Sequence, residues 1–312
     1  MGNSCGYSKK LIFSLLVLNF TLNATSFTYN EALAKFYELN IQIPKPDNDG
    51  RIPTLNNKGS AVIASDQMSY KLLGSKDYLA SAFLEFIKGK EALEIGGCYG
   101  DLMQIALQQS NTTKYTLNDL DERHLFIAAK SMSEKITNGL LDYNCTDQSQ
   151  FIQADISDAS QIKNLGFYDA IYAGNVFLFL TPEQLELAVQ HLFLLLKPNG
   201  RVYIGTPSPY AKFIEKFAPE YMRRIKAKEK NPSFIKKLRD YAEIKDNMPS
   251  RIIDMLDGSI LLLDPATLKE VFKRNGFKIL ECQYMALPSK SKLWRNNNNG
   301  YVILIAKKEI IM

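Results

Sequence analysis

The chain has 312 residues, of which 46% are apolar and 23% charged, so it is long enough to bury a core in one large α/β domain or in a domain with lobes attached. The formal net charge of +5 is too small to indicate a nucleic-acid-binding protein by itself. The four cysteines are scattered without metal-ligand spacing, which argues against a zinc site and against a disulfide framework.

The first 26 residues differ in composition from the rest of the chain. Lys9 and Lys10 precede a short apolar run at residues 11–22, and the small residues Ala24-Thr-Ser26 follow it. A basic start, a short apolar run and small residues are typical of a secretory signal peptide. The run is shorter than the ~20 residues of a membrane-spanning helix. We therefore expect residues 1–26 to be a signal peptide, or otherwise an apolar N-terminal segment that is buried or tethers the chain to a membrane.

Residues 27–89 are expected to form a helical N-terminal lobe. Thr28-Tyr-Asn-Glu31 has the pattern of a capping box that opens a helix over Ala32–Leu39. Residues 43–59 are rich in Pro, Asn, Asp and Gly and predict a loop. Apolar residues then recur at spacings of three and four in residues 65–73 and 75–87, which predicts two more helices.

From residue 90 onward, short apolar runs alternate with helical patterns, which is the signature of a parallel sheet with helices on both faces. The five runs that predict strands are Ala92–Ile95, Tyr115–Asn118, Phe151–Ala154, Asp169–Ala173 and Arg201–Thr206. The helical patterns between them cover Leu102–Gln109, Glu122–Thr137, Ala159–Asn164 and Pro182–Leu196. Lys197-Pro-Asn-Gly200 predicts a turn into the fifth strand.

The alternation stops between Tyr210 and Gly258, where the sequence predicts a basic, helical insertion. Residues 211–240 hold ten Lys or Arg against four acidic residues. An apolar stripe at helical spacing is formed by Phe213, Ile214, Phe217, Tyr221 and Ile225. Such a stretch is either a lid with solvated charges or a surface that lies on a membrane or meets an acidic partner.

After the insertion the pattern of the sheet resumes. Asp264-Pro265 predicts a helix N-terminus, and Asn275-Gly276 predicts its end. Phe277–Met285 and Tyr301–Ala306 predict two strands that form an antiparallel pair, with Asn299-Gly300 as a tight corner.

The expected fold is thus α/β, with a doubly wound Rossmann-like sheet of seven strands whose last strand is antiparallel. The sheet domain covers residues 90–312, and the helical insertion at residues 210–258 follows its fifth strand. The helical lobe at residues 27–89 precedes it.

Five segments of this domain carry a family resemblance through their order and spacing. They are Leu93–Gly100, Thr116–Leu125, Phe151–Ile156, Tyr168–Leu180 and Leu195–Ile204. Together with the closing strand pair, they resemble a class I S-adenosylmethionine-dependent methyltransferase over residues 90–306. The resemblance implies S-adenosyl-L-methionine as the cofactor.

The first of these segments resembles the family's glycine-rich motif. The resemblance implies that Gly96, Gly97 and Gly100 let the backbone approach the methionine end of the cofactor, with Glu94 as the acid of the motif. Cys98 departs from the family pattern, because it stands where the middle glycine is expected. No histidine neighbours Cys98 in the sequence, so it is not expected to act as a nucleophile.

The strand ends that follow supply the other expected cofactor-binding residues. Asp119 ends the second strand about 20 residues after the glycines, where a carboxylate can accept from a ribose diol. Asp155 ends the third strand and can accept from the adenine amino group, while Leu120 and Ile156 can sandwich the ring. Each acid could instead only cap the next helix, and Asp121 is the more natural cap after Asp119.

Asn175 ends the fourth strand and completes the expected site. With Tyr210, it is also expected to line the acceptor pocket beyond the strand ends.

No residue stands out as a catalytic base, so the catalytic residues are unknown from the sequence. The two histidines, His124 and His191, are expected to be packing or surface residues. Methyl transfer does not require a strong base, because the sulfonium is an activated donor and positioning can supply up to about 7–11 kcal/mol.

The predicted function is S-adenosylmethionine-dependent methyl transfer to a small-molecule, lipid-like or protein acceptor. Two alternatives stay open: a non-catalytic binding protein on a methyltransferase fold, and an NAD-dependent Rossmann oxidoreductase, which shares the strand–glycine–helix opening. Nucleic-acid substrates are disfavoured, because basic and aromatic residues are not interleaved. No metal is expected.

The expected location contains a conflict between two features. The N-terminal pattern predicts export, whereas the cofactor is made in the cytosol. The protein could therefore act in the cytosol of another cell, stay tethered to a membrane, or start further downstream. Membrane contact could also come through the basic insertion.

Overall fold

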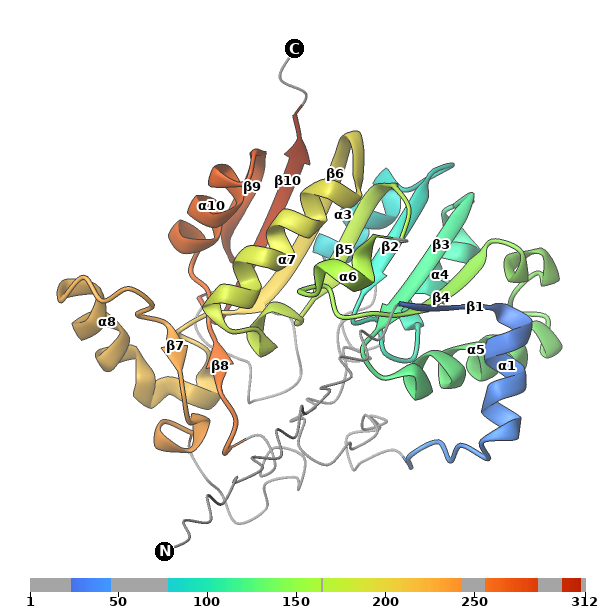
Figure 1. Cartoon of the computed structure of the whole chain (residues 1–312), viewed down its shortest axis with the longest axis horizontal. Helices are drawn as coiled ribbons and strands as arrows, with labels where there is room; N and C mark the ends of the chain where they lie inside the picture. The colour runs from blue at the N-terminus through green and yellow to red at the C-terminus, as the bar shows by residue number, and fades with distance from the viewer. Residues whose placement is uncertain (1–23, 46–77, 164, 243–255, 286–298, 310–312) are drawn as a thin grey trace, which may run out of the picture.

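A mixed sheet of eight strands forms the centre of the computed structural model, which describes residues 24–45, 78–163, 165–242, 256–285 and 299–309. Figure 1 shows its strands running side by side in the order β1-β4-β3-β2-β5-β6-β10-β9. Their bounds are β1 Thr25–Thr28, β2 Glu91–Ile95, β3 Lys114–Asp119, β4 Ser149–Gln153, β5 Tyr168–Gly174, β6 Leu196–Pro207, β9 Phe277–Met285 and β10 Tyr301–Lys308. The five central strands are parallel, and β10 runs antiparallel between β6 and β9, as predicted.

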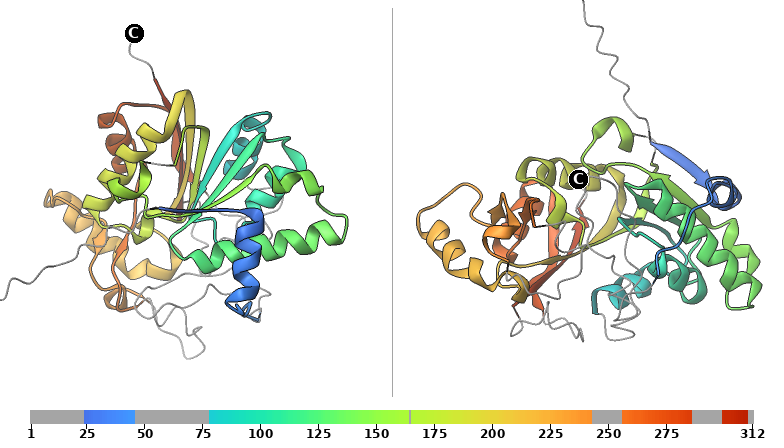
Figure 2. Two further views of the ribbon diagram at one scale, coloured as in Figure 1. Left: turned by 45° about the vertical axis from the view of Figure 1, so that its right-hand side comes forward. Right: turned by 90° about the horizontal axis from the view of Figure 1, so that it is seen from below.

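Helices cover both faces of this sheet, as the two views in Figure 2 show. One layer holds α1 (Tyr29–Glu38), α3 (Tyr78–Phe86), α4 (Asp101–Gln109) and α5 (Glu122–Thr137). The other holds α6 (Ala159–Ile162), α7 (Pro182–Leu195) and α10 (Pro265–Arg274). Successive strand residues point to opposite faces, so Ala92 joins the first core and Leu93 the second. The central parallel strands are largely apolar on both faces because both of their faces are buried.

The eighth strand, β1, is the main difference from the predicted seven-stranded sheet. β1 pairs antiparallel with β4 and covers that edge of the sheet. The Phe27 ring packs edge-on against Phe126 of α5, 5.1 Å between ring centroids. Four residues are too few for a clear alternation in the sequence, and the pairing joins segments more than 120 residues apart, so local pattern did not reveal it.

The helix after β1 confirms the predicted capping box. Thr28 is the N-cap of α1, its hydroxyl accepts from the Glu31 amide, and the Glu31 carboxylate accepts from the Thr28 amide. The helix spans Tyr29–Glu38 rather than Ala32–Leu39, because the capping residue stands directly before its first turn.

The insertion is less helical than predicted. The short helix η4 (Lys212–Phe217) and α8 (Ala218–Lys226) are followed by a two-stranded sheet of β7 (Phe234–Ile235) and β8 (Ile260–Leu261), with the short helix η5 (Leu238–Asp240) between them. A separate small core holds the insertion together and includes Leu178 from the short helix η3 (Phe177–Phe179) after β5. Strand pairs of two residues leave no periodicity in the sequence.

The predicted apolar stripe of the insertion is buried only in part. Ile214, Phe217 and Tyr221 lie in the small core, whereas Ile225 is 41% exposed. Ile225 therefore faces away from the packing surface.

The strands and helices of the sheet domain otherwise lie where the sequence placed them. One correction concerns Lys197–Gly200, which lies within β6 as an irregularity of the β5–β6 register, with Asn199 at a φ of 65°. Asp264 is the N-cap of α10, as predicted. Several predicted segments lie outside the described residues. They are most of the predicted signal peptide, the helix at 65–73, most of the loop at 43–59 and the part of the loop between β9 and β10 at 286–298. Within the described part, no helix is both long and apolar enough to cross a membrane.

Candidate active site

The glycine-rich turn connects β2 to α4 and is packed tightly on both sides. Gly96 has a φ of 65°, and a Cβ there would lie 2.6 Å from Val176 Cγ2. A Cβ on Gly97 would lie 2.2 Å from Leu117 Cδ1. The Gly97 amide donates to the carbonyl of Asn118, 3.1 Å away, which ties the turn to the end of β3. The turn therefore has no room for larger residues at these two positions.

Cys98 adopts the left-handed conformation that the middle glycine of such a turn would adopt. Its φ is 49°, and its side chain is buried. The Cys98 amide donates to Oδ2 of Asp119, 3.0 Å away. Cys98 thus carries backbone strain that glycine at this position would not.

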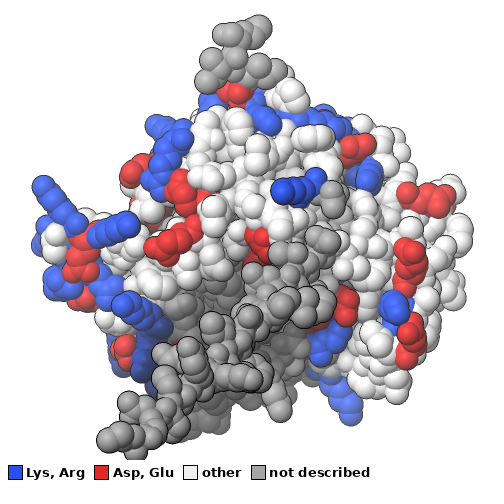
Figure 3. Space-filling view, viewed as in Figure 1, with Lys and Arg blue, Asp and Glu red and all other residues white. Residues whose placement is uncertain are grey.

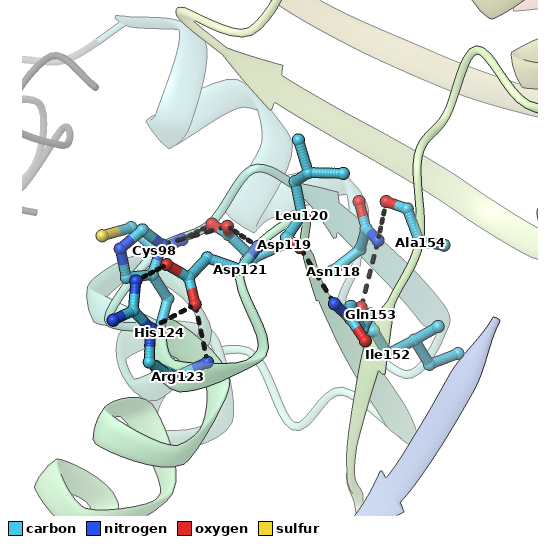
Figure 4. A network of polar contacts seen from close by, with 10 residues as sticks. All are labelled: Cys98, Asn118, Asp119, Leu120, Asp121, Arg123, His124, Ile152, Gln153 and Ala154. Carbon is cyan, nitrogen blue, oxygen red and sulfur yellow. Dashed lines mark hydrogen bonds and ion pairs between the residues drawn. The ribbon is translucent and has the colours of Figure 1, made fainter. Parts of the chain in front are cut away.

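Asp119 is the centre of a polar network at the end of β3, shown in Figure 4. Its Oδ1 accepts from the amide of Asp121 and from Nδ1 of His124, each 3.0 Å away, while Oδ2 accepts from Cys98. The residue is buried, with 8% of its surface exposed. Asp121 caps α5 by accepting from the Arg123 amide, so Asp121 is the cap of this helix, as predicted.

His124 was expected to be a packing or surface residue, and the structure buries it beside Asp119. It lies in the first turn of α5, is 3% exposed and meets the Tyr99 ring edge-on at 5.4 Å. Burial lowers the pKa of His124, but the hydrogen bond to Asp119 and the charges of Asp119 and Asp121 outweigh it, so the pKa is raised overall. In the sequence, the one indication of this contact is that His124 stands about one helical turn after the strand-end acid Asp119.

Leu120 and Asn118 shape the next part of the site. The Leu120 side chain is 64% exposed beside Asp119, and its carbonyl accepts from Gln153 Nε2 at 3.2 Å. Asn118 Nδ2 donates to the carbonyls of Ile152 and Ala154, each 3.0 Å away. These bonds fix the ends of β3 and β4 side by side, as Figure 4 shows. The exposed Leu120 side chain remains accessible to a ligand at this position.

Asp155 and Ile156 follow β4, but their side chains differ in exposure. Asp155 is half-buried, and its Oδ1 accepts from the amide and hydroxyl of Ser157 at 2.8 and 2.7 Å. The N-cap of α6 is Asp158, so Asp155 does not cap that helix. Ile156 is buried in the core, and its carbonyl accepts from Nδ1 of His191 at 2.6 Å.

Glu94 lies within β2, beneath the turn. It is buried, and its Oε2 accepts from the Tyr115 hydroxyl at 2.9 Å. Burial and the neighbouring Glu94 charge raise the pKa of Tyr115 well above its usual value, so Tyr115 stays protonated and donates. Glu94 thus connects β2 with β3 directly below the glycine turn.

Asn175 closes the other side of the turn. Its φ is 54°, and its amide donates to the carbonyl of Gly205, 2.7 Å away. Its side-chain Oδ1 is buried without a hydrogen-bond partner among the described residues. A buried acceptor without a donor is costly in free energy, so this oxygen is suited to receive a ligand's donor.

Tyr210 lies apart from this network, in a group of aromatic residues beyond β6. Its ring meets Tyr221 of α8 at 5.8 Å and Tyr284 of β9 at 6.0 Å. The Tyr221 hydroxyl donates to Asp264 at 2.5 Å. Burial raises the pKa of all three tyrosines, so they stay neutral at physiological pH.

Comparison with known proteins agrees with this geometry. Residues 93–202, less than half of the chain, match the family model described as a methyltransferase domain. These residues are therefore similar to a methyltransferase domain, and the chain shares the fold of solved S-adenosylmethionine-dependent methyltransferases. No curated protein matches the chain in sequence.

Solved structures of methyltransferases share the fold at low identity. An S-adenosylmethionine-dependent methyltransferase from Methanosarcina mazei is 13% identical, with a TM-score of 0.50, over 74% of this chain and 97% of the other. A putative methyltransferase of Haloferax volcanii, in complex with the Trm112 methyltransferase activator, is 11% identical, with a TM-score of 0.50, over 78% and 93%. Magnesium protoporphyrin IX methyltransferase from Synechocystis PCC 6803, with bound S-adenosylhomocysteine, is 15% identical, with a TM-score of 0.46, over 74% and 81%.

The strand order separates the methyltransferase domain from the oxidoreductase alternative. A dinucleotide-binding Rossmann sheet has the order 3-2-1-4-5-6 with all strands parallel. Here β10 lies antiparallel between β6 and the edge strand β9. The similar protein from Methanosarcina mazei is described as dependent on S-adenosylmethionine, which is the cofactor considered for this site.

The residues at the site fit this cofactor. Asp119 Oδ2 accepts one hydrogen bond among the described residues, so it keeps a lone pair for a hydroxyl donor. Asn175 Oδ1 is a buried acceptor without a partner in the described part of the chain, and Leu120 offers an exposed apolar surface. Hydroxyl donors, an amino donor and an apolar ring are the groups that S-adenosylmethionine presents. Within the described residues, no cluster of acidic, cysteine or histidine side chains could hold a metal ion.

Proposed function

We propose that this protein transfers a methyl group from S-adenosylmethionine to a small-molecule or lipid-like acceptor. The observation that carries the proposal is the tightly packed glycine turn held against Asp119 at the carboxyl ends of β2 and β3. Open α/β sheets bind their ligands at this end of the strands.

The proposed roles follow from the geometry of the site. When bound, the cofactor supplies an activated methyl group on a sulfonium centre. Asp119, Leu120 and Asp155 bind and orient it, and the backbone of Gly96 and Gly97 lies closest to its methionine end. Because the donor is already activated, the residues contribute mainly positioning and the exclusion of water, which are worth up to about 7–11 kcal/mol in favourable cases.

We place the acceptor beyond the ends of β5 and β6, between Asn175 and the tyrosine group of Tyr210, Tyr221 and Tyr284. The aromatic group is largely apolar but carries hydroxyls, which suits an acceptor with an apolar body. Alanine at Tyr210 is expected to lower acceptor turnover more than cofactor affinity, whereas alanine at Asn175 is expected to lower both. The reverse result would contradict this placement.

A lipid-like acceptor is supported by the outer surface of α8. Met222 and Ile225 are 43% and 41% exposed, next to Arg223 and Lys226. Lys and Arg gather with acidic residues at the left of Figure 3, where α8 lies in Figure 1. Exposed apolar residues among basic ones favour contact with an anionic membrane surface. Cosedimentation with anionic but not neutral vesicles, reduced in the double variant M222S/I225S, would support this contact.

A protein acceptor or partner is the other candidate, because one similar structure is a complex of a putative methyltransferase with an activator protein. Size-exclusion chromatography of the purified chain with candidate partners, followed by transfer assays on each complex, tests this candidate. Transfer to isolated small molecules by the chain alone would argue that no partner is required.

Calorimetry with S-adenosylhomocysteine and with NAD tests the proposed function directly. We expect binding of S-adenosylhomocysteine and none of NAD. Transfer of a radiolabelled methyl group from S-adenosylmethionine into lipid or small-molecule extracts then identifies the acceptor class. Binding of neither nucleoside would favour a non-catalytic protein on this fold and would overturn the proposal.

We infer that the protein acts where S-adenosylmethionine is supplied, in the cytosol of its own or of another cell, and that the N-terminal segment directs or tethers it. Mass spectrometry of the mature chain separates these routes. A chain that begins at Phe27 supports cleavage of a signal peptide, whereas an intact N-terminus supports a tether.

A further inference from the structure

A closed ring of contacts includes the strand-end acid Asp119. Its other members are Cys98, Tyr99 and His124. The Cys98 amide donates to Asp119 Oδ2, and His124 Nδ1 bonds to Asp119 Oδ1, both at 3.0 Å. The His124 ring meets the Tyr99 ring edge-on, with the ring planes at 89°. Tyr99 follows Cys98 directly in the glycine turn. The ring therefore joins three elements of the chain: the turn after β2, the end of β3 and the first turn of α5.

We propose that His124 is a positioning residue for cofactor binding: it orients the Asp119 carboxylate and braces the glycine turn through Tyr99. This inference rests on the proposed function and adds to it a residue outside the glycine motif and the strand-end acids. His124 itself is not placed in contact with the cofactor.

The geometry sets the direction of the hydrogen bond. A carboxylate can only accept, so Nδ1 of His124 carries the hydrogen and donates to Asp119. With the Asp121 amide as the second donor, Oδ1 is saturated, and its position is defined from two directions. Oδ2 then faces Cys98 and keeps its remaining lone pair for a ligand. Without His124, the carboxylate can rotate and lose this orientation.

The residues around His124 give it two separate contacts, a hydrogen bond and a packing contact. Three charged groups shift the pKa of His124: Asp119 at the end of β3 and Asp121 raise it, and Arg123 lowers it. The Tyr99 ring packs against His124 from the glycine turn. A phenylalanine would fill the same space and keep the contact with Tyr99, but it would leave Asp119 short of one donor. The hydrogen bond and the packing can therefore be separated by substitution.

The test compares binding of S-adenosylhomocysteine to wild type, H124F and H124N by calorimetry, with thermal unfolding of each. H124F keeps an aromatic ring and removes the donor, whereas H124N places an amide donor near the position of Nδ1. T137A, at the far end of α5, removes a hydroxyl bond to the Ser133 carbonyl and serves as the control. We expect about a tenfold rise in Kd for H124F, a smaller rise for H124N and no change for T137A.

A second measurement tests the geometry without any ligand. Nitrogen-15 NMR of the histidine rings should show His124 with its hydrogen on Nδ1 and with a raised pKa, and both should be lost in D119N. If the His124 ring carries its hydrogen on Nε2 in wild type and its spectrum is unchanged in D119N, the inference is wrong.

The outcomes separate the inference from the proposed function. If wild type binds and H124F binds equally well, the inference is wrong and the proposed function stands. If H124F and H124N lose affinity and thermal stability alike, without rescue by the amide, a purely structural role replaces the positioning role. If no form of the protein binds, the proposed function fails, and the inference fails with it.

Discussion

Cys98 occupies a backbone conformation that costs a side-chain-bearing residue about 1–2 kcal/mol. Its φ of 49° lies in the left-handed region, and its amide donates to Oδ2 of Asp119. At the scale of single residues, the site therefore depends on backbone conformation at Cys98 and on acceptor geometry at Asp119.

C98G is expected to leave the free energy of unfolding within about 1 kcal/mol of wild type, because relief of backbone strain offsets the loss of a small buried side chain. C98V is expected to lose about 2 kcal/mol or more, since a β-branched residue is strongly disfavoured at positive φ. Urea denaturation measures both. A loss above 2 kcal/mol for C98G would show that the thiol, and not the backbone, matters here.

D119N is expected to raise the Kd for S-adenosylhomocysteine about 10–100-fold, because charge-assisted hydrogen bonds are worth about 1.5–3 kcal/mol each. D142N is the matched control, since the Asp142 carboxylate caps the short helix η2 (Tyr143–Thr146) by accepting from the Asn144 amide, away from the glycine turn. Calorimetry measures both variants. Equal affinity of D119N and wild type would remove Asp119 from the binding site.

At the scale of elements, the segment of β1 has two interpretations: a signal-peptide cleavage site in the sequence and an edge strand in the structure. The small residues that predict a signal-peptide cleavage site, Ala24-Thr-Ser26, include two of the four residues of β1. Ser26 accepts a hydrogen bond from Gln150 Nε2 at 2.8 Å, and Thr25 pairs with Gln153. Cleavage after Ser26 would therefore remove half of a strand that covers the sheet edge.

A chain that starts at Phe27 is expected to unfold about 2–6 °C below one that starts at Ala24, because it loses about 1–2 kcal/mol of strand pairing and the Ser26 bond. It should also aggregate more readily, since the edge of β4 is left partly unpaired. Calorimetry and light scattering measure the two effects. Identical behaviour of the two chains would mean that Thr25 and Ser26 contribute nothing to the fold, as a cleaved signal peptide requires.

At the scale of the whole molecule, stability should depend on pH through the same network. The pKa of His124 is raised in the folded chain, so its contribution is fully present below the unfolded pKa of about 6.5 and is lost as pH rises through the folded value. Burial alone would raise the pKa of Asp121, but its bonds to Arg123 lower it overall. The contribution of Asp121 is therefore present near neutral pH and is lost in acid.

The difference in unfolding free energy between wild type and H124F is expected to be largest near pH 6 and to shrink as the pH rises into the alkaline range. Urea denaturation at a series of pH values, with T137A as the control, measures this dependence. A constant difference across the series would show that His124 does not change charge in this range.

The sequence by itself determined the parallel sheet, its helices and the strand-end acids. Runs such as Ala92–Ile95 are mostly apolar, and a cap residue marks a helix start between them, as at Asp121. These signals are local, because propensity, periodicity and capping act within a few residues. The spacing from the glycines to Asp119 predicted that the glycine turn and the acid lie at the same end of the sheet, and the Cys98 amide does bond to Asp119 there.

Only the tertiary structure decided which distant groups meet. The pairing of β1 with β4, the two-residue strands β7 and β8, and the contact of His124 with Tyr99 all join residues far apart in the chain or too short to have a period. Such contacts are selected by the burial of shared surface and by hydrogen bonds that must be satisfied once water is excluded. The sequence therefore determined where the acid stands, and the packing around it determined which way the carboxylate points.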